Sequence, residues 1–204
     1  MYYEVRLEDT IRIPPNKFSD DLGEVVTSIV QKTFEGTMRK KYGLIVIADD
    51  IEPIGNGVVI HGDGAMYQKV SFNALTYKPE LQEVIDAVVC EIVEFGAFCH
   101  IGPLDALVHM SQIMNDYVEV DSESEVITGK EKKQTLQTGD PVRARIVAVS
   151  LNELSSRESK IGLTMRQPNL GAHKWIYEDE EEEKKKKDKK KEQKKKSKKG
   201  KDKK

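Results

Sequence analysis

The fold of this chain is decided by residues 94–113, EFGAFCHIGPLDALVHMSQI. Two apolar runs, 97–101 and 106–110, each have about the length of a short strand. Gly102-Pro103 stands between them, and proline interrupts a strand because it cannot donate a ladder hydrogen bond. The stretch therefore predicts two short strands that are joined by a turn.

The first of these strands has two chemically different faces. Side chains alternate along a strand, so Ala97, Cys99 and Ile101 share one face. Phe98 and His100 lie on the other face. The small apolar set is suited to the inside of a barrel, an arrangement that turns Phe98 outward.

Further short apolar runs surround this pair of strands. They lie at residues 84–94, 125–128, 142–149 and 160–165. Five or six short strands with short turns predict a small closed barrel. A polar insertion, residues 115–139, interrupts the series, and we expect most of it to lie on the surface.

The run at 142–149 places two arginines, Arg143 and Arg145, on one face of a strand. Its other, apolar face consists of Val142, Ala144, Ile146 and Ala148. With Phe98 on a neighbouring strand, the arginines would make a surface that stacks bases and contacts phosphates. The pattern leaves a second interpretation open, in which Phe98 is a core residue and the arginines only keep the strand face soluble.

The N-terminal part has the pattern of a strand followed by a helix. Residues 2–13 alternate between apolar and polar side chains and then meet Pro14-Pro15, which ends a strand. Ser19, Asp20 and Asp21 then supply an N-cap and negative charge at the start of a helix. Seven apolar residues at helical spacing run through and beyond this segment. They are Phe18, Leu22, Val25, Val26, Ile29, Val30 and Phe34.

Apolar runs and glycine-rich segments alternate after this helix. The runs are residues 44–47, 58–60 and 66–75, and the glycine segments are Gly55-Asn56-Gly57 and Gly62-Asp63-Gly64. No lysine followed by serine or threonine stands at a strand-to-helix junction, so the glycines do not indicate a phosphate-binding loop. They are typical of turns, which need positive φ. We expect an antiparallel meander that packs on the helix.

Charge is divided unevenly along the chain. The chain has 33 basic and 35 acidic residues, of which 15 lysines and 9 acidic residues lie from Glu178 onward. The part of the chain before Glu178 therefore has 18 basic and 26 acidic residues, a net charge of −8. A body of that charge repels a polyanion at long range, so nucleic-acid binding would need a local surface. The last segment has no apolar residue and predicts a disordered tail, which either binds nucleic acid through its charge or only aids solubility.

Composition argues against several classes of protein. Cys90 and Cys99 are the only cysteines and form no CxxC pair, so we expect two buried, reduced thiols and no metal site. Apolar runs are strand-sized and residues 1–12 lack the apolar stretch of a signal peptide, which predicts a cytoplasmic protein without a membrane segment. Scattered carboxylates and the absence of a nucleophile–base motif predict no catalytic residues and no cofactor.

Residues 94–98 and 101–113 closely resemble the S-one RNA-binding domain, an OB fold named after a ribosomal protein. In that family two phenylalanines and a histidine face the RNA. By motif match, the resemblance implies that Phe95, Phe98 and His109 face RNA here.

The chain departs from the S-one pattern at three positions. Ala106 stands where glycine is usual, Ser150 where an acidic residue is common, and Lys160 where arginine is common. The motif and the arginine-bearing strand together indicate a site for single-stranded RNA with weak sequence preference. We expect its residues to be Phe95, Phe98, His109, Arg143, Arg145 and Lys160.

The N-terminal half is similar to the polymerase stalk subunit that is called E-prime in archaea, a relative of the seventh subunit of eukaryotic RNA polymerase II. The similar residues are 55–59, 62–64 and 70–75, and residues 160–168 extend the resemblance to nearly all of 1–177. It implies an α+β N-terminal domain with an antiparallel sheet and a packed helix, followed by an all-β OB-fold barrel. We expect domain bounds of 1–79 for a polymerase-docking tip domain, 80–177 for the barrel and 178–204 for a disordered, lysine-rich tail.

The same resemblance implies a non-catalytic subunit of DNA-directed RNA polymerase, a nucleotidyltransferase complex. Such a protein pairs with the small helical stalk partner of archaeal RNA polymerase as a heterodimer, docks on the polymerase core and binds nascent RNA. The docking loops would contain Gly55, Asn56, Gly57, Gly62, Asp63 and Gly64. The alternative is an S-one-domain protein of translation initiation or RNA decay, although such proteins share the barrel and not this N-terminal half.

Overall fold

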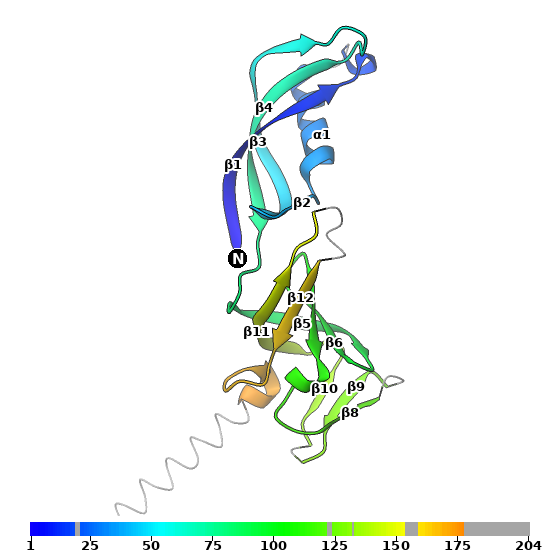
Figure 1. The fold of residues 1–204 in the computed structure, drawn as a ribbon, viewed down its shortest axis with the longest axis vertical. Helices are drawn as coiled ribbons and strands as arrows, with labels where there is room; N and C mark the ends of the chain where they lie inside the picture. Colours follow the sequence, from blue (N-terminus) through cyan, green and yellow to red (C-terminus); the bar gives the residue numbers. More distant parts are fainter. Residues whose placement is uncertain (19–20, 122–123, 132, 154–158, 178–204) are drawn as a thin grey trace, which may run out of the picture. The chain divides into compact units, whose positions relative to one another are not determined.

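A computed structural model describes residues 1–18, 21–121, 124–131, 133–153 and 159–177 (Figure 1). The predicted disordered tail, residues 178–204, therefore lies outside the described residues. The chain divides into two compact units. Among the described residues, the first unit comprises those within 1–83, 102–105 and 146–161, and the second comprises those within 84–101, 106–145 and 162–177. In the part of the chain that the structure describes, no helix has both the length and the apolarity to cross a lipid bilayer.

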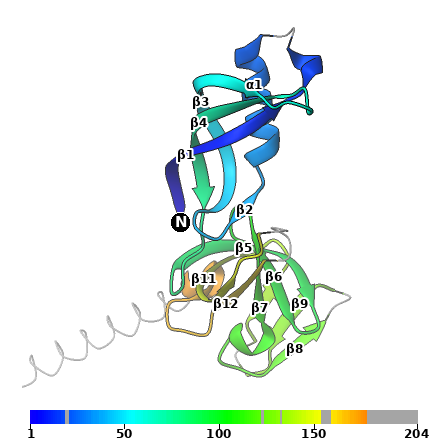
Figure 2. The ribbon, with the colours of Figure 1, turned by 45° about the horizontal axis from the view of Figure 1, so that its top comes forward.

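The first unit is an antiparallel sheet with one helix, as predicted. Its strands are β1 (Tyr2–Ile13), β2 (Met38–Arg39), β3 (Gly43–Val59) and β4 (Met66–Tyr77), in the order β1-β4-β3-β2. The helix α1 (Leu22–Phe34) runs beside this sheet (Figures 1 and 2). Its buried residues pack on the sheet, and the rings of Phe34 and Phe72 lie 4.9 Å apart.

The start of α1 differs in part from the expectation. Asp21 is the N-cap, since its carboxylate accepts a hydrogen bond of 2.8 Å from the backbone N–H of Gly23. The other predicted cap residues, 19 and 20, lie outside the described residues. Phe18 and Leu22 fit the apolar spacing of the helix but are 46% and 45% exposed. Phe18 precedes the helix and Leu22 opens it, before the first buried turn at Val25.

The strand β3 replaces the two separate strands that were predicted around Gly55-Asn56-Gly57. The ladder between β3 and β4 shifts register between Ile54 and Val58, so the glycine segment forms a bulge inside one long strand and the turn predicted there was wrong. The second glycine segment is a turn, as predicted. Gly62 and Gly64 both have positive φ, and a short 3-10 helix, η1 (Pro15–Lys17), lies beside this turn at Pro15.

Most of the second unit belongs to an OB-type barrel, some strands of which extend into segments of the first unit, and this barrel confirms the predicted fold class. The barrel strands are β5 (Val84–Val93), β6 (Gly96–His100), β7 (Asp105–His109), β11 (Pro141–Ser150) and β12 (Lys160–Thr164). The order β12-β7-β6-β5-β11 is closed by pairing of β12 with β11, and the short strand β13 (Gly171–Ala172) pairs with the edge of β11 opposite β5. Ala97 and Cys99 are fully buried, as predicted, whereas Ala148 is exposed, so its assignment to the apolar face was wrong.

The insertion forms a small sheet of its own. Its strands are β8 (Val118–Asp121), β9 (Val126–Gly129) and β10 (Thr135–Gln137), in the order β10-β9-β8. The strand predicted at 125–128 is therefore present as β9 but does not belong to the barrel. Ile127 and Leu136 are fully buried, so this mostly polar segment still contributes to the core.

The two cysteines form no disulfide and have different environments. Cys99 is fully buried, as predicted, whereas Cys90 is only half-buried and sits where the register of β5 and β6 shifts. Burial, with a smaller contribution from Cys90, raises the pKa of the Cys99 thiol to about 12. Because the thiolate is the reactive form, Cys99 should be inert near neutral pH.

Titration of the native chain with a thiol-specific disulfide reagent at pH 8 should therefore modify Cys90 and leave Cys99 unmodified. Denaturant should expose both thiols. Cys90→Ser should remove the fast reaction of the native chain and leave one thiol to react in denaturant. Fast reaction of two thiols in the native protein would contradict this assignment.

Candidate nucleic-acid interface

Three residues named by the S-one motif come together in the second unit. Phe95 lies in the turn between β5 and β6, Phe98 lies on β6, and His109 ends β7. The two phenyl rings meet edge to face at 6.2 Å, and Phe95 is 50% exposed. The Phe95 carbonyl accepts a 2.9 Å hydrogen bond from the backbone N–H of Met110, which holds the Phe95 turn next to His109. We call Phe95, Phe98 and His109 the aromatic face.

His109 is exposed and its ring is held by the backbone that follows it. Its Nδ1 accepts a hydrogen bond of 3.2 Å from the N–H of Ser111 and lies 2.9 Å from the Ser111 hydroxyl. These contacts cap the short 3-10 helix η2 (Met110–Gln112). A neutral imidazole that accepts at Nδ1 carries its proton on Nε2, so His109 keeps one ring donor for a ligand.

The two arginines lie apart from the aromatic face, contrary to the arrangement expected from the sequence. The strand β5 stands between β6 and β11, so Phe98 and the arginines are not on neighbouring strands. Arg143 pairs with Asp86 on β5, whereas Phe98 pairs with Glu91, five residues further along. Five residues of strand span about 16 Å.

The charge of Arg143 is also partly compensated by an ion pair within the barrel. Its Nε donates to Asp86 at 2.9 Å, and the same carboxylate lies 3.2 Å from the ring of His173. Arg143 and, to a lesser degree, His173 hold the pKa of Asp86 below its ordinary value. Arg145 is half-buried, and its Nε has no hydrogen-bond partner among the described residues. Lys160 is exposed and belongs to the first unit.

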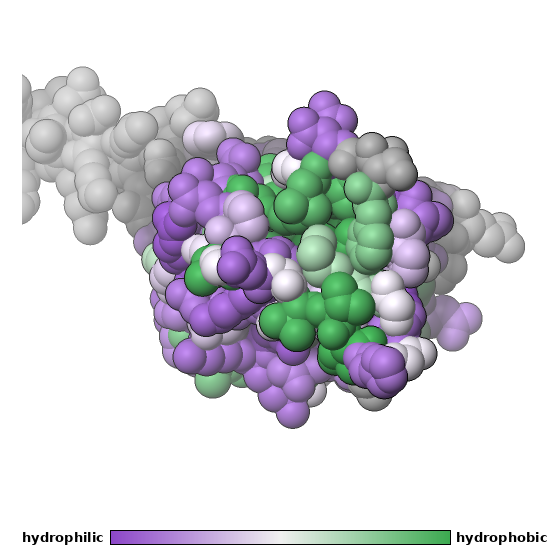
Figure 3. Space-filling model, turned by 90° about the horizontal axis from the view of Figure 1, so that it is seen from above, coloured by the Kyte–Doolittle hydropathy of each residue, from purple (hydrophilic) through white to green (hydrophobic). Residues whose placement is uncertain are grey.

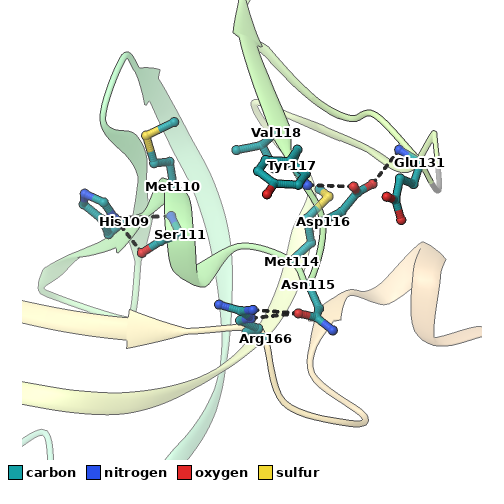
Figure 4. Close-up of a pocket in the computed structure, with 10 residues that line it drawn as sticks. All are labelled: His109, Met110, Ser111, Met114, Asn115, Asp116, Tyr117, Val118, Glu131 and Arg166. Atoms are coloured by element: carbon teal, nitrogen blue, oxygen red, sulfur yellow. Dashed lines mark hydrogen bonds between the residues drawn. The ribbon is translucent and has the colours of Figure 1, made fainter.

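A pocket of about 570 Å³ adjoins the aromatic face at His109 (Figure 4). Its walls include Tyr117 and Arg166, which the sequence analysis did not select. Tyr117 is the single aromatic residue of the polar insertion, and Arg166 follows directly on the predicted last strand. Their positions were visible in the sequence, but their proximity was not.

The turn 62–64 in the first unit is organised by its own side chains. Arg12 donates to Asp63 at 2.6 and 2.9 Å, and the Tyr67 hydroxyl donates to Asp63 at 2.9 Å. The bonds from Arg12 and then from Tyr67 lower the pKa of Asp63 to about 2. These bonds hold the turn in shape. Asp63, one of the residues expected to contact the polymerase, thus has a structural role within its own unit.

Exposed apolar residues gather at the same end of the first unit. We call Phe18, Leu22, Val58, Val59 and Ile60 the tip patch. Val58 and Val59 are 62% and 60% exposed, and Figure 3 shows apolar side chains grouped on the face seen from above. Exposed apolar groups that cluster in this way mark interaction surfaces. This patch was not expected from the sequence, in which Phe18 and Leu22 fit the apolar spacing of the helix.

Comparison with known proteins covers both units. Residues 78–157 match the S1 RNA binding domain, and residues 8–64 match the SHS2 domain found in the N terminus of Rpb7p/Rpc25p/MJ0397. The solution structure of GSP13 from Bacillus subtilis is similar over 44% of this chain and 57% of that chain, with 26% identity and a TM-score of 0.32. The two family matches, with the fold described above, define a protein with an SHS2-type N-terminal part and an S1-type barrel.

Two curated relatives match most of the chain. The DNA-directed RNA polymerase subunit Rpo7 of Saccharolobus solfataricus is 35% identical over 89% of this chain and 100% of its own length. The RNA polymerase II subunit rpb7 of Dictyostelium discoideum is 26% identical over 72% of this chain and 86% of its own length. The chain belongs to the Rpo7 family of DNA-directed RNA polymerase subunits.

Proposed function

We propose that this chain is a non-catalytic stalk subunit that binds nascent single-stranded RNA with the aromatic face of its S1-type barrel. The observation that carries the proposal is the grouping of exposed Phe95 and His109 with half-buried Phe98 on one surface. An exposed ring offers a stacking surface to any base, and stacking contributes about 1–3 kcal/mol per base. His109 adds a hydrogen-bond donor beside the rings.

The first unit, in this proposal, docks on the polymerase core through the tip patch. The exposed apolar residues of the tip patch supply the contact area. The 62–64 turn that follows Ile60 is held in shape because Asp63 is bonded to Arg12 and Tyr67. Of the predicted docking residues, Gly55, Asn56, Gly57, Gly62 and Gly64 shape the bulge and the turn from which Val58, Val59 and Ile60 project. A heterodimer with the small helical stalk partner of archaeal RNA polymerase completes the proposed stalk.

The alternative role in translation initiation or RNA decay has less support. The resemblance to Rpo7 extends over 89% of the chain and therefore includes the N-terminal unit. Such a role would leave that unit and its tip patch without an explanation.

The RNA-binding part is tested with Phe95→Ala combined with Phe98→Ala. Binding of a labelled, unstructured RNA of about 12 nucleotides, within the span of OB-fold sites, should weaken at least about tenfold because two stacking surfaces are lost. Fluorescence anisotropy at several salt concentrations measures the affinity.

Phe18→Ala is the matched control, because Phe18 is 46% exposed, close to the 50% of Phe95, but lies in the first unit. Its RNA affinity should stay at the wild-type value. An affinity of the double variant that matches the wild type throughout the salt series would refute RNA binding by the aromatic face.

A further inference from the structure

The pocket beside His109 is formed by three segments of the second unit that lie far apart in sequence. His109 and Ser111 line one side, Tyr117 and Glu131 line the other, and Arg166 lies with Asn115 between them (Figure 4). Its volume of about 570 Å³ falls within the range of roughly 300–1,000 Å³ that is typical of small-molecule sites. The backbone N–H of Met165 donates to Gln112 at 2.8 Å, which fixes Arg166 next to η2.

Arg166 brings an uncompensated positive charge to this pocket. Its Nε and Nη2 both donate to the amide oxygen of Asn115, at 3.1 and 2.7 Å. These bonds orient the guanidinium without neutralising it, and among the described residues no carboxylate forms an ion pair with Arg166. Arg143 differs, because Asp86 compensates its charge. A planar, oriented and unpaired guanidinium is suited to a phosphate group.

Tyr117 provides an aromatic surface on the opposite side. Its side chain is 77% exposed, while its backbone is fixed by a hydrogen bond from its N–H to Asp116 at 2.6 Å and by one from Lys130 N–H to its carbonyl at 2.9 Å. Because the Tyr117 ring is exposed, it does not contribute to packing of the core. It offers a π-face on which a base can stack.

The two acidic residues of the pocket have different roles. The carboxylate of Asp116 accepts from the backbone N–H groups of Tyr117 and Glu131, so its charge is stabilised inside the protein. Glu131 is exposed and its carboxylate accepts no hydrogen bond from the described residues. A free carboxylate repels phosphate but accepts a hydrogen bond from an exocyclic amino group of a base. The charges therefore place a phosphate at Arg166 and a base near Tyr117 and Glu131.

We propose that this pocket is a subsite for one nucleotide of unpaired RNA whose base carries an exocyclic amino group. The base stacks on Tyr117 and donates to Glu131, and its phosphate contacts Arg166. The inference rests on the proposed RNA-binding function, because His109 belongs to both the aromatic face and the pocket. In this arrangement, an RNA strand that contacts Phe98 and Phe95 continues past His109 into the pocket.

The test uses the full chain and two labelled RNAs of equal length, oligocytidine and oligouridine. Tyr117→Ala should weaken binding of oligocytidine about tenfold, whereas Tyr117→Phe keeps the ring and should bind as the wild type does. Arg166→Gln should reduce the slope of log affinity against log salt by about 0.7, the value for one phosphate on a single strand. Glu131→Ala should weaken oligocytidine about fivefold and leave oligouridine unchanged, since uracil has no amino group.

The outcomes separate the subsite from the proposed function. If the Tyr117 and Arg166 variants bind both RNAs as the wild type does while Phe95→Ala with Phe98→Ala binds weakly, the subsite is refuted and the aromatic face stands. If all of these variants bind RNA as the wild type does, both proposals are refuted. A loss with Tyr117→Phe equal to that with Tyr117→Ala would refute base stacking. Unchanged fluorescence of Trp175 in each variant confirms that the second unit is folded.

Discussion

Replacing Gly96 by alanine should lower the free energy of unfolding of the barrel by about 3 kcal/mol. A β-carbon at Gly96 would lie 2.1 Å from the carbonyl oxygen of Val108 and 3.0 Å from the α-carbon of His109. Both atoms belong to the backbone of β7, which cannot move aside as a flexible side chain could. Alanine must therefore push β6 and β7 apart, directly beneath the aromatic face.

Urea unfolding followed by Trp175 fluorescence measures this effect in the second unit. Trp175 is the only tryptophan, is buried, and donates from its indole N–H to the carbonyl of Thr135 at 3.2 Å. Gly139→Ala is the matched control, because Gly139 has a φ of +89° but no atom within 4 Å of the added carbon. Its cost should be about 1–2 kcal/mol, from the backbone conformation alone. Equal midpoints for the two variants would show that close approach at Gly96 is not important.

Acidic substitutions in the tip patch should abolish stable association with polymerase core. Val58→Asp combined with Ile60→Asp would bury two unpaired charges in an apolar contact, and we expect at least about 100-fold weaker binding, or about 3 kcal/mol. The variant should still fold, since the two side chains are 62% and 49% exposed in the free chain. Binding of a tagged chain to purified core enzyme measures the affinity.

A second pair of exposed valines serves as the control for this experiment. Val84 and Val88 on β5 are 46% and 45% exposed, so Val84→Asp with Val88→Asp adds the same charge outside the tip patch. This control should bind core as the wild type does. Core binding that survives the tip variant, or that is lost equally in the control, would contradict docking through the tip patch.

The S-one stretch shows why part of the site could be read from sequence. Phe95 and Phe98 are three residues apart and His109 follows within the next strand, so strand alternation and one tight turn bring them together. Local chemistry also decided the cap at Asp21 and the turn at Gly62 and Gly64. Each of these features depends on residues that are near neighbours in the chain.

Other features depend on strand order, which periodicity does not contain. Phe98 and Arg143 were expected together, but β5 lies between their strands and the register separates them. The bulge at Gly55-Asn56-Gly57 looked like a turn because glycine and asparagine serve both structures. Phe18 and Leu22 fit a helical core pattern, although only the packed unit shows that they face solvent.

The sequence by itself determined the fold class and the proximity of Phe95, Phe98 and His109, because alternation and the S-one motif are local patterns with direct structural consequences. The tertiary structure alone decided which of two arginines has its charge compensated by a carboxylate. Arg143 and Arg166 are indistinguishable by type, but β-sheet register places Asp86 beside Arg143, whereas η2 and the insertion place only the neutral Asn115 beside Arg166. The charge that a side chain presents to a ligand is set by its neighbours in space.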